Sequence, residues 1–407
     1  MKVNRRTFLQ STAASAAAGM FSSSAWAEDP INVASIHDLS GGLDIYGKPM
    51  VDAMILAVEE ANAAGGLLGR QIKLINYDTQ SNMQLYTQFA QQAALKDKVA
   101  VVMGGITSAS REVIRPVLDR AKTLYFYNTQ YEGGVCDRGI FCTGVTPAQT
   151  VGKLVPYAMK KWGKKIYVVA ADYNYGQITS QWVKKFAQEN GGSTVAIEFF
   201  PLDVTNFGPT ISKIEAAKPD MLFSALVGGA HISFYRQWAA AGLNKKIPLA
   251  SSTFGVGNEQ IVLSAEEANG YLLAYNYFES VATPSNKAFL ERFHKRFGAD
   301  YSNVTELACG TYQGFKLWAE GVKKAGSTDV AKVTTALESG ISIEGPSGKV
   351  SIDAATHHCV LNVSLAEVQA KKFKILETFD QAPPSDTSAV CNLKKNPKDN
   401  QQYVIKV

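Results

Sequence analysis

Short apolar runs alternate with longer stretches of helical period along most of the chain. Residues 31–36 form the first apolar run, and residues 49–64 follow with apolar side chains on one stripe until two glycines end the pattern. The same alternation continues to residue 127 and begins again after Pro147. Strands that alternate with helices are typical of βαβ units and parallel sheets. The pattern therefore predicts an α/β protein with two successive sheets of similar length.

The predicted elements divide into those two sets and a shorter closing segment. The predicted strands are residues 31–36, 72–77, 100–103, 124–127, 166–170, 194–200, 221–225 and 248–251. The predicted helices are residues 49–64, 83–95, 108–122, 152–161, 179–189, 207–217, 232–241, 285–297 and 308–324. Short β-like runs follow at residues 349–352 and 373–379. Because these late runs are too few for a third sheet, we expect them to pack back onto the first two.

The first 27 residues have the three-part layout of an export signal. Lys2, Arg5 and Arg6 form a charged start, an Ala-rich stretch follows at residues 11–20, and small residues around Ala27 suit a signal peptidase. The paired arginines also resemble a twin-arginine signal, with the ordinary secretory route as the alternative. No later segment is apolar over the ~20 residues that a bilayer helix needs. We therefore expect cleavage near Ala27 and a mature protein in the periplasm.

Charge and length narrow the classes of partner and the number of domains. The net charge falls from +5 to +2 when the three positive charges of the first 27 residues are left out. Such a balance gives no electrostatic case for nucleic acid or for an anionic membrane. About 380 residues remain, which is enough for two domains at ~100–200 residues each.

The cysteines and histidines give no sign of a metal centre or a cofactor. An oxidising compartment permits a disulfide between Cys136 and Cys142 across a short loop, and another between Cys359 and Cys391, with buried free thiols as the alternative. The fifth cysteine, Cys309, makes the number odd. No cysteine pair has CxxC spacing, and no HExxH motif occurs. We expect neither metal nor cofactor.

Several segments together resemble a known family. Residues 39–42 (Leu-Ser-Gly-Gly) and 57–70 resemble the amino-terminal stretch of type I periplasmic solute-binding proteins of the branched-chain amino-acid transporter group. Other segments are closest to the urea and short-chain amide binders of that family. These segments are 107–111, 131–133, 143–147, 172–173, 200–202, 345–348 and 357–358.

The resemblance implies a fold, a function and partners. The fold is α/β, with two Rossmann-like lobes joined by a multi-strand hinge that close over a ligand. Lobe 1 is expected at 28–147 plus 275–343, and lobe 2 at 148–274 plus 344–407. The implied function is that of a non-enzymatic solute-binding component of an ABC importer, which holds urea or a short-chain amide in the cleft. Permease and ATPase subunits are the implied protein partners, and we expect a monomer.

The first candidate ligand residues follow strands of the first set. Ser108 opens a predicted helix, so its hydroxyl and the free N–H groups there can bind a carbonyl or carboxylate oxygen. Helix capping alone is the alternative for Ser108, and Thr107 beside it is a further candidate. The resemblance places Tyr127 and Thr129 facing the cleft, with simple packing as the alternative.

The second set of strands supplies the opposite wall. Asp172, Tyr173 and Tyr175 lie in the loop after its first strand, where tyrosines supply flat walls and hydroxyls and the aspartate accepts from N–H groups. Ordinary packing between lobes is the alternative. Gly228 and Gly229 follow another strand and let the backbone approach a ligand closely, with a plain turn as the alternative.

Phe254 departs from the pattern of the leucine-type binders. Those proteins carry at this position a glutamate that pairs with the ligand's ammonium group. An ammonium without its carboxylate is costly to desolvate. Phe254 is therefore a candidate cleft residue that argues against an α-amino acid, unless Asp172 or Glu132 compensates. Glu132 itself we interpret as structural.

Three rival functions are weighed against this interpretation. An enzyme is disfavoured because the chain has no GxSxG elbow, Walker loop or dinucleotide fingerprint. A ligand-sensing regulator is disfavoured by the export signal. A branched-chain or other amino-acid binder of the same transporter class stays open.

Overall fold

The computed structural model describes residues 29–406, so the expected export signal lies outside the described part of the chain. Within it, a 14-stranded sheet has the main strand order β2-β1-β3-β4-β6-β14-β11-β10-β9-β7-β8. One group of strands comprises β2 (Ile72–Asp78), β1 (Ile31–His37), β3 (Val101–Gly104), β4 (Leu124–Tyr127) and β6 (Ile140–Cys142). The other comprises β11 (Leu272–Tyr275), β10 (Leu249–Ser251), β9 (Met221–Ala225), β7 (Lys165–Ala171) and β8 (Ser193–Phe200). Within each group the strands pair in parallel.

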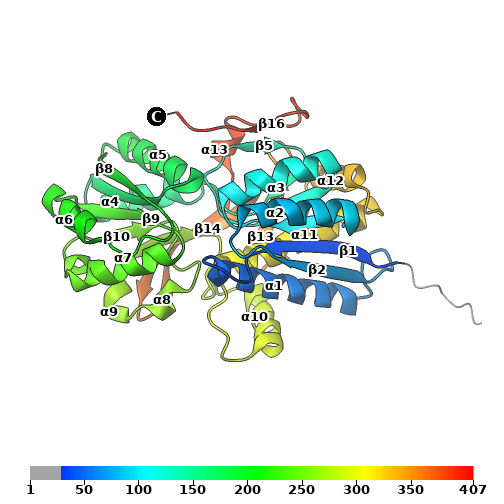
Figure 1. Cartoon of the computed structure of the whole chain (residues 1–407), viewed down its shortest axis with the longest axis horizontal. Coiled ribbons are helices and arrows are strands. Elements are labelled where there is room, and N and C mark those ends of the chain that lie inside the picture. The colour runs from blue at the N-terminus through cyan, green and yellow to red at the C-terminus, as the bar shows by residue number, and fades with distance from the viewer. Residues whose placement is uncertain (1–28, 407) are drawn as a thin grey trace, which may run out of the picture.

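The helices divide in the same way and define two halves of the molecule (Figure 1). The first half carries α1 (Asp44–Ala63), α2 (Met83–Gln91), α3 (Ser108–Ala121), α10 (Pro284–Phe297), α11 (Glu306–Ala325) and α12 (Val330–Glu338). The second half carries α4 (Val151–Trp162), α5 (Asn174–Glu189), α6 (Gly208–Ala217), α7 (Gly229–Ala240), α8 (Glu259–Val262) and α9 (Ala265–Ala268). The expected α/β class is confirmed.

The central strands are buried along almost their whole length. In β7 every residue except Lys165 is buried, and in β9 every residue is. Because helices cover both faces of such strands, their sequences are apolar at nearly every position and do not alternate between apolar and polar residues. The short apolar runs in the sequence therefore correspond to strands of the core.

Helix α1 begins earlier than the sequence predicts. It starts at Asp44 and contains Pro49 inside its second turn, whereas the sequence places the helix start at Pro49. An acidic residue in the first turn is favourable beside the partial positive charge of a helix N-terminus. The added turn brings Tyr46 toward the second half of the molecule.

The closing segment packs back onto both groups of strands, as expected. β14 (His358–Gln369) has 12 residues and forms a hairpin with β15 (Lys372–Ala382). Its first residues pair with β13 (Gly348–Asp353) and its last with β11. At ~3.3 Å per residue a strand of this length spans roughly 40 Å, enough to run from one half to the other.

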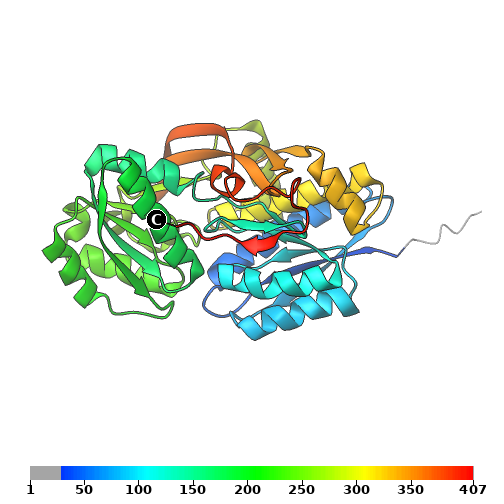
Figure 2. The same cartoon turned by 90° about the horizontal axis from the view of Figure 1, so that it is seen from above.

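The pairing differs from the expected assignment of all residues 344–407 to the second lobe. β13, which also pairs with β12 (Ser342–Gly345), joins the sheet of the first half. Further on, β16 (Asn400–Gln402) pairs with β5 (Val135–Asp137) of the first half. Figure 2 shows the tail from α13 (Ser385–Ser388) crossing over the junction, with its end above α5. The remaining lobe boundaries stay a prediction.

The disulfide also differs from the expected pair. Cys136 is bonded to Cys391, which lies 255 residues away in sequence, and Cys142 and Cys359 are free and buried. Cys142 lies on β6 inside the main sheet, whereas Cys136 lies on β5 and faces the tail. The expected Cys136–Cys142 and Cys359–Cys391 pairs are therefore wrong, and the alternative of buried free thiols holds for Cys142 and Cys359. Cys136 and Cys142 do not pair because β5 and β6 belong to different sheets.

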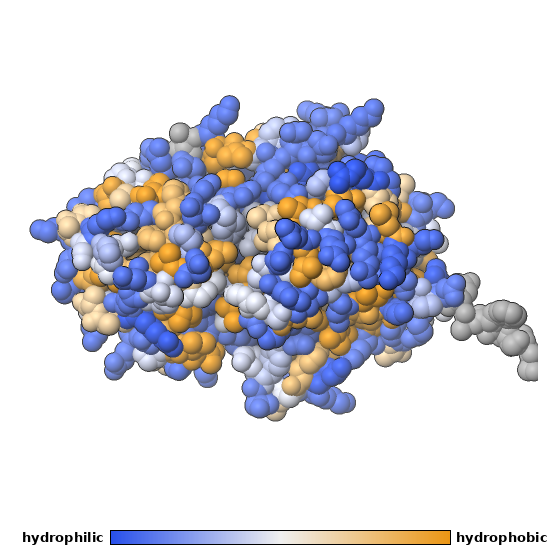
Figure 3. All heavy atoms as spheres, viewed as in Figure 1, coloured by the Kyte–Doolittle hydropathy of each residue, from blue (hydrophilic) through white to orange (hydrophobic). Residues whose placement is uncertain are grey.

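The face of the molecule in Figure 3 mixes hydrophilic and hydrophobic residues without one dominant apolar area. Among the described helices, none combines the length and apolar character that a membrane span needs.

Candidate functional site

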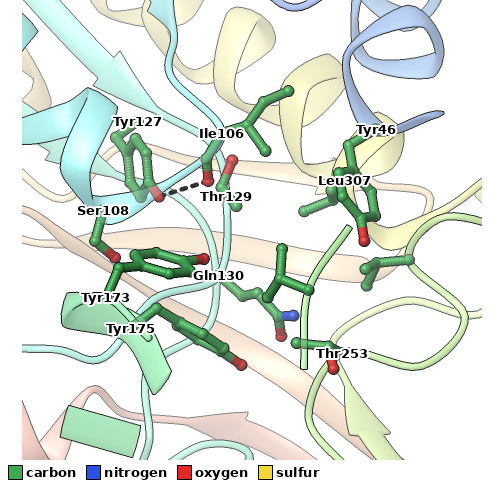
Figure 4. A pocket seen from close by; sticks show the side chains of 12 residues that line it. Tyr46, Ile106, Ser108, Tyr127, Thr129, Gln130, Tyr173, Tyr175, Thr253 and Leu307 are labelled. Carbon is green, nitrogen blue, oxygen red and sulfur yellow. Dashed lines mark hydrogen bonds between the residues drawn. The ribbon is translucent and has the colours of Figure 1, made fainter. Parts of the chain in front are cut away.

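A cavity lies between the two halves, at the carboxyl ends of strands from both (Figure 4). Its volume is about 30 Å³. One water needs about 10–15 Å³ of such space, so the cavity in this conformation holds a guest of only a few non-hydrogen atoms. The lining residues are Tyr46, Ile106, Ser108, Tyr127, Thr129, Gln130, Tyr173, Tyr175, Val227, Thr253, Val256 and Leu307.

Ser108 and Thr107 have separate tasks at the start of α3. Thr107 is the N-cap: its hydroxyl accepts from the backbone N–H of Ser110 at 3.0 Å, and the Ser110 hydroxyl accepts from the Thr107 N–H at 3.1 Å. This reciprocal capping commits Thr107 to the helix. Ser108 lines the cavity, and its hydroxyl donates to Oε2 of Glu132. Of the two candidates, the structure therefore brings only Ser108 to the cavity wall.

Glu132 lies directly behind Ser108 and is fully buried. Its Oε1 accepts from Nη2 of Arg111 at 2.9 Å, and the Arg111 guanidinium lies over the rings of Tyr127 and Tyr131. A buried carboxylate needs such partners, because an unpaired charge is very costly to desolvate. Sequence alone could not show that Glu132 touches Ser108 of the cavity wall.

Tyr127 and Thr129 line the cavity, as the resemblance implies. The Tyr127 hydroxyl donates to the carbonyl of Ile106 at 3.0 Å, and the Thr129 hydroxyl donates to the carbonyl of Gly105 at 3.1 Å. Burial raises the pKa of Tyr127 well above its usual range, so the hydroxyl keeps its proton. Gly105 has a φ of +79°, a conformation that favours glycine, and this turn aims the two carbonyls at the hydroxyls.

Tyr173 and Tyr175 form the facing wall from the second half. Their ring centroids are 6.2 Å apart. The Tyr175 hydroxyl donates to Oγ of Ser252 at 2.8 Å, and Gln130 of the first half donates its side-chain N–H to the Ser252 carbonyl at 2.7 Å. Gln130 and Tyr175 thus meet at one residue from opposite sides of the cavity.

Four other sequence candidates lie outside the cavity lining. Asp172 is exposed and accepts from Gln177, and Gly229 is exposed at the start of α7. Gly228 has a φ of +72° and donates its N–H to the Tyr46 hydroxyl at 3.0 Å, so it contacts a lining residue without lining the cavity itself.

Phe254, the fourth, is fully buried and does not line the cavity, which corrects the expectation for it. Its ring packs against Tyr235 and Tyr271, each with a centroid distance of 5.2 Å. Aromatic rings gain from edge-to-face packing of this kind, and that packing holds Phe254 away from the cavity.

Sequence reasoning missed Tyr46, whose hydroxyl also hydrogen-bonds to Nε2 of His231 at 3.3 Å. It missed the other lining residues for a common reason, since each is an ordinary apolar or polar residue without a motif of its own. These are Ile106, Gln130, Val227, Thr253, Val256 and Leu307. Tyr46 follows the first predicted strand, so the strand-end rule applied to that loop could have found it.

Four hydroxyls of the cavity wall offer hydrogen-bond acceptors to a guest. The hydroxyl protons of Ser108, Tyr127, Thr129 and Tyr175 all go to protein oxygens, which leaves their oxygen lone pairs for a guest. None of the lining side chains is charged. Within residues 29–406, no cluster of three or more His, Cys, Asp or Glu side chains could hold a metal ion. The arrangement is suited to holding a small molecule by hydrogen bonds and ring faces.

Comparison with known proteins establishes the family. A family model described as a periplasmic binding protein domain matches residues 31–387. The leucine-, isoleucine-, valine-, threonine-, and alanine-binding protein of Pseudomonas aeruginosa is 28% identical over 362 residues, which cover 87% of this chain and 93% of that protein. Leu/Ile/Val-binding protein homolog 6 of Brucella melitensis is 24% identical and covers 84% of this chain and 88% of its own length.

Solved structures of solute-binding proteins are also similar to this chain. A solute-binding protein of an ABC transporter from R. palustris, in complex with 4-hydroxybenzoate, is 26% identical with a TM-score of 0.78, covering 88% of this chain and 98% of that one. A solute-binding protein from Rhodopseudomonas palustris HaA2, in complex with p-hydroxybenzoic acid, is 27% identical with a TM-score of 0.79, covering 89% and 100%. The chain belongs to the periplasmic binding protein family.

Proposed function

We propose that this member of the periplasmic binding protein family is the extracytoplasmic solute-binding component of an ABC importer. In this proposal it binds a small uncharged polar molecule, urea or a short-chain amide, in the cavity between the two halves and releases it unaltered. The observation that carries the proposal is a small cavity lined by hydroxyls, an amide and aromatic rings, with no charged side chain among its lining residues.

The lack of charge in the lining favours a neutral guest. A charged group that leaves water for such a cavity would have no opposite charge to meet, which is costly. The resemblance places Phe254, an uncharged residue, where leucine-type binders carry a carboxylate. Asp172, the expected substitute, is exposed and outside the cavity. Glu132 is already paired with Arg111. An α-amino acid would therefore leave its ammonium group without a carboxylate partner among the lining residues.

Amides and urea match the hydrogen-bonding groups of the wall. Their N–H groups can donate to the lone pairs of Ser108, Tyr127 and Thr129. Their carbonyl oxygen can accept from the first N–H groups of α3, which have no partner within the helix. Tyr173 adds a ring face and a hydroxyl at the opposite wall.

The second candidate is a branched-chain or other amino-acid binder of the same transporter class. Two observations favour it: the named amino-acid-binding relative that is 28% identical, and the four apolar lining residues Ile106, Val227, Val256 and Leu307. An α-carboxylate would fit the start of α3 for the same reason as an amide oxygen.

The proposal includes location, movement and partners. The protein would be exported by its amino-terminal signal and act in the periplasm. Two lobes, close to residues 28–147 plus 275–343 and 148–274 plus the later segment, would close over the guest by hinge motion. The closed form would dock on permease and ATPase subunits.

The test is a thermal-shift screen followed by calorimetry. We expect urea, formamide, acetamide or propionamide to raise the melting temperature, since a ligand at a hundredfold excess over Kd stabilises by about 2.7 kcal/mol. Ser108→Ala and Tyr173→Ala should each lower affinity at least about tenfold, the loss of roughly 1.4 kcal/mol of contact. Asp172→Ala, in the same loop as Tyr173 but outside the cavity, is the control and should bind normally.

Two results would contradict the proposal. Tighter binding of leucine, valine or alanine than of every amide would select the second candidate. Conversion of the bound amide, seen by recovering the guest after incubation, would make the protein an enzyme.

A further inference from the structure

The direction of one hydrogen bond in the cavity wall is decided by the protein. The Ser108 hydroxyl donates to Oε2 of Glu132. Because the Glu132 carboxylate pairs with Arg111 and serves as the acceptor of this bond, the Ser108 hydroxyl proton points away from the cavity toward Glu132. The Ser108 oxygen then faces the cavity with lone pairs alone.

Three further donors contact Glu132. Arg111 donates to Oε1 at 2.9 Å, and Gln402 of the tail donates its side-chain N–H to the same oxygen. Trp182 of α5 donates its indole N–H to the Glu132 backbone carbonyl at 3.0 Å. Every partner is a donor, and they come from α3, α5 and the tail. Since Glu132 meets only donors, it accepts the Ser108 proton whether or not the Gln402 donor is present.

We propose that Glu132 is a specificity-determining positioning residue, which makes the Ser108 oxygen a hydrogen-bond acceptor and so selects guests that present an N–H there over carboxylates of the same shape. The inference rests on the proposed function, because it concerns the same cavity. It names the feature that the guest must carry: a donor at the Ser108 end. A carboxylate oxygen at that place would face lone pairs and gain no hydrogen bond from the hydroxyl.

The hydroxyls of Tyr127 and Thr129 also face the cavity as hydrogen-bond acceptors. Tyr127 and Thr129 give their protons to backbone carbonyls, and a carbonyl, like Glu132, can only accept. A carboxylate would therefore meet three hydroxyl oxygens that are all committed as acceptors. Of the three hydroxyl protons, only that of Ser108 goes to a side chain. A substitution can therefore reverse the direction of the Ser108 hydrogen bond but not of the other two.

The variant Glu132→Gln should reverse the direction of the Ser108 hydrogen bond with almost no change of side-chain shape. The oxygen of the introduced amide can keep the contacts with Arg111 and Gln402, which turns the amide N–H toward Ser108. The Ser108 hydroxyl then accepts from this N–H and can turn its own proton into the cavity. Arg111 retains Glu112, whose Oε1 lies 2.9 Å from its Nε, as an ionic partner.

The experiment measures selectivity by calorimetry with two pairs of equal shape: acetamide against acetate, and propionamide against propionate. In the wild type we expect each amide to bind at least about tenfold more tightly than its carboxylate, the effect of one hydrogen bond. In Glu132→Gln we expect the ratio to fall by about tenfold. Ser108→Ala should reduce the same ratio by weakening amide binding alone, and it tests the inference even where Glu132→Gln does not fold.

Gln402→Ala is the matched control, since it removes another donor to the same carboxylate but leaves the Ser108 contact in place. Its amide-to-carboxylate ratio should equal that of the wild type. A general loss of order in the cavity would weaken the binding of amides and carboxylates equally and leave the ratio unchanged. A change in the ratio therefore reports the direction of the Ser108 hydrogen bond and not the packing of the cavity.

The outcomes distinguish the two proposals. If the wild type binds amides but Glu132→Gln and Ser108→Ala keep its ratio, the inference is wrong and the proposed function stands. A wild type that prefers carboxylates, or a Gln402→Ala ratio that falls as far as that of Glu132→Gln, also overturns the inference. If the wild type binds no amide and no urea, the proposed ligand class fails and the inference fails with it.

Discussion

Glu306 is a buried glutamate whose two carboxyl oxygens have no hydrogen-bond partner within the described residues. It is the first residue of α11, next to Leu307 of the cavity lining. Burial raises the pKa of Glu306 from 4.5 to about 8. The folded protein therefore holds a proton on Glu306 at neutral pH, because an unpaired carboxylate at this site would be poorly solvated.

Glu306→Gln should stabilise the protein in a pH-dependent way. Between pH 4.5 and about 8 the folded form binds this proton and the unfolded form does not, so the wild-type free energy of unfolding falls as pH rises through that range. Glutamine cannot titrate. We expect the melting temperature of the variant to exceed that of the wild type most at pH 8 and to match it near pH 4. A difference that stays constant across this range would contradict the assignment.

At the scale of elements, the tail is held to the first half by two independent connections. The disulfide joins Cys136 to Cys391, and β16 pairs with β5, the strand that carries Cys136. Together they place Gln402 against Glu132. A segment near the end of the chain thereby completes the surroundings of a residue that touches the cavity wall.

Removing the disulfide should destabilise the whole chain. A crosslink between residues 255 apart restricts the unfolded state strongly. We expect the double variant Cys136→Ser, Cys391→Ser to lose about 2–4 kcal/mol of unfolding free energy in urea titrations. Dithiothreitol should lower the wild type to the same value and leave the double variant unchanged. Equal stability of the two proteins without reductant would show that the bond does not form in solution.

At the scale of the whole molecule, Tyr46 connects the two halves. It lies on α1 of the first half, and its hydroxyl accepts from Gly228 and hydrogen-bonds to His231, both of the second half. Such contacts exist only while the halves are close together. These hydrogen bonds therefore stabilise a closed form relative to an open one. A guest can shift the populations of the two forms only by binding one of them more tightly.

Tyr46→Phe should therefore favour the open form. We expect the radius of gyration of the unliganded variant, measured by small-angle scattering, to exceed that of the wild type, and the guest affinity to fall several-fold, as the loss of about 1 kcal/mol implies. Tyr301→Phe is the control, because that hydroxyl donates to Asp52 at 2.7 Å within the first half. An unchanged radius in Tyr46→Phe would mean that these contacts do not hold the halves together.

Local sequence determined most of the elements and the edge at which the cavity lies, but it did not predict strand β14 or helix α12. The predicted strand at 221–225 coincides with β9, and the predicted helix at 108–122 differs from α3 by one residue. The strand-end rule placed Ser108, Tyr127 and Thr129 at that edge, because helical and strand periods are encoded over a few neighbouring positions. The resemblance to a known family placed Tyr127 and Thr129 facing the cleft.

Only the tertiary structure decided which distant residues meet. The tertiary structure joins Cys136 to Cys391 and places Glu132 behind Ser108. It also packs the Phe254 ring within an aromatic cluster away from the cavity. Each of these outcomes depends on where whole strands and helices pack. Neither residue type nor spacing carries that information, because chain segments tens to hundreds of residues apart are brought together by burial of their apolar faces, and burial is a property of the assembled molecule.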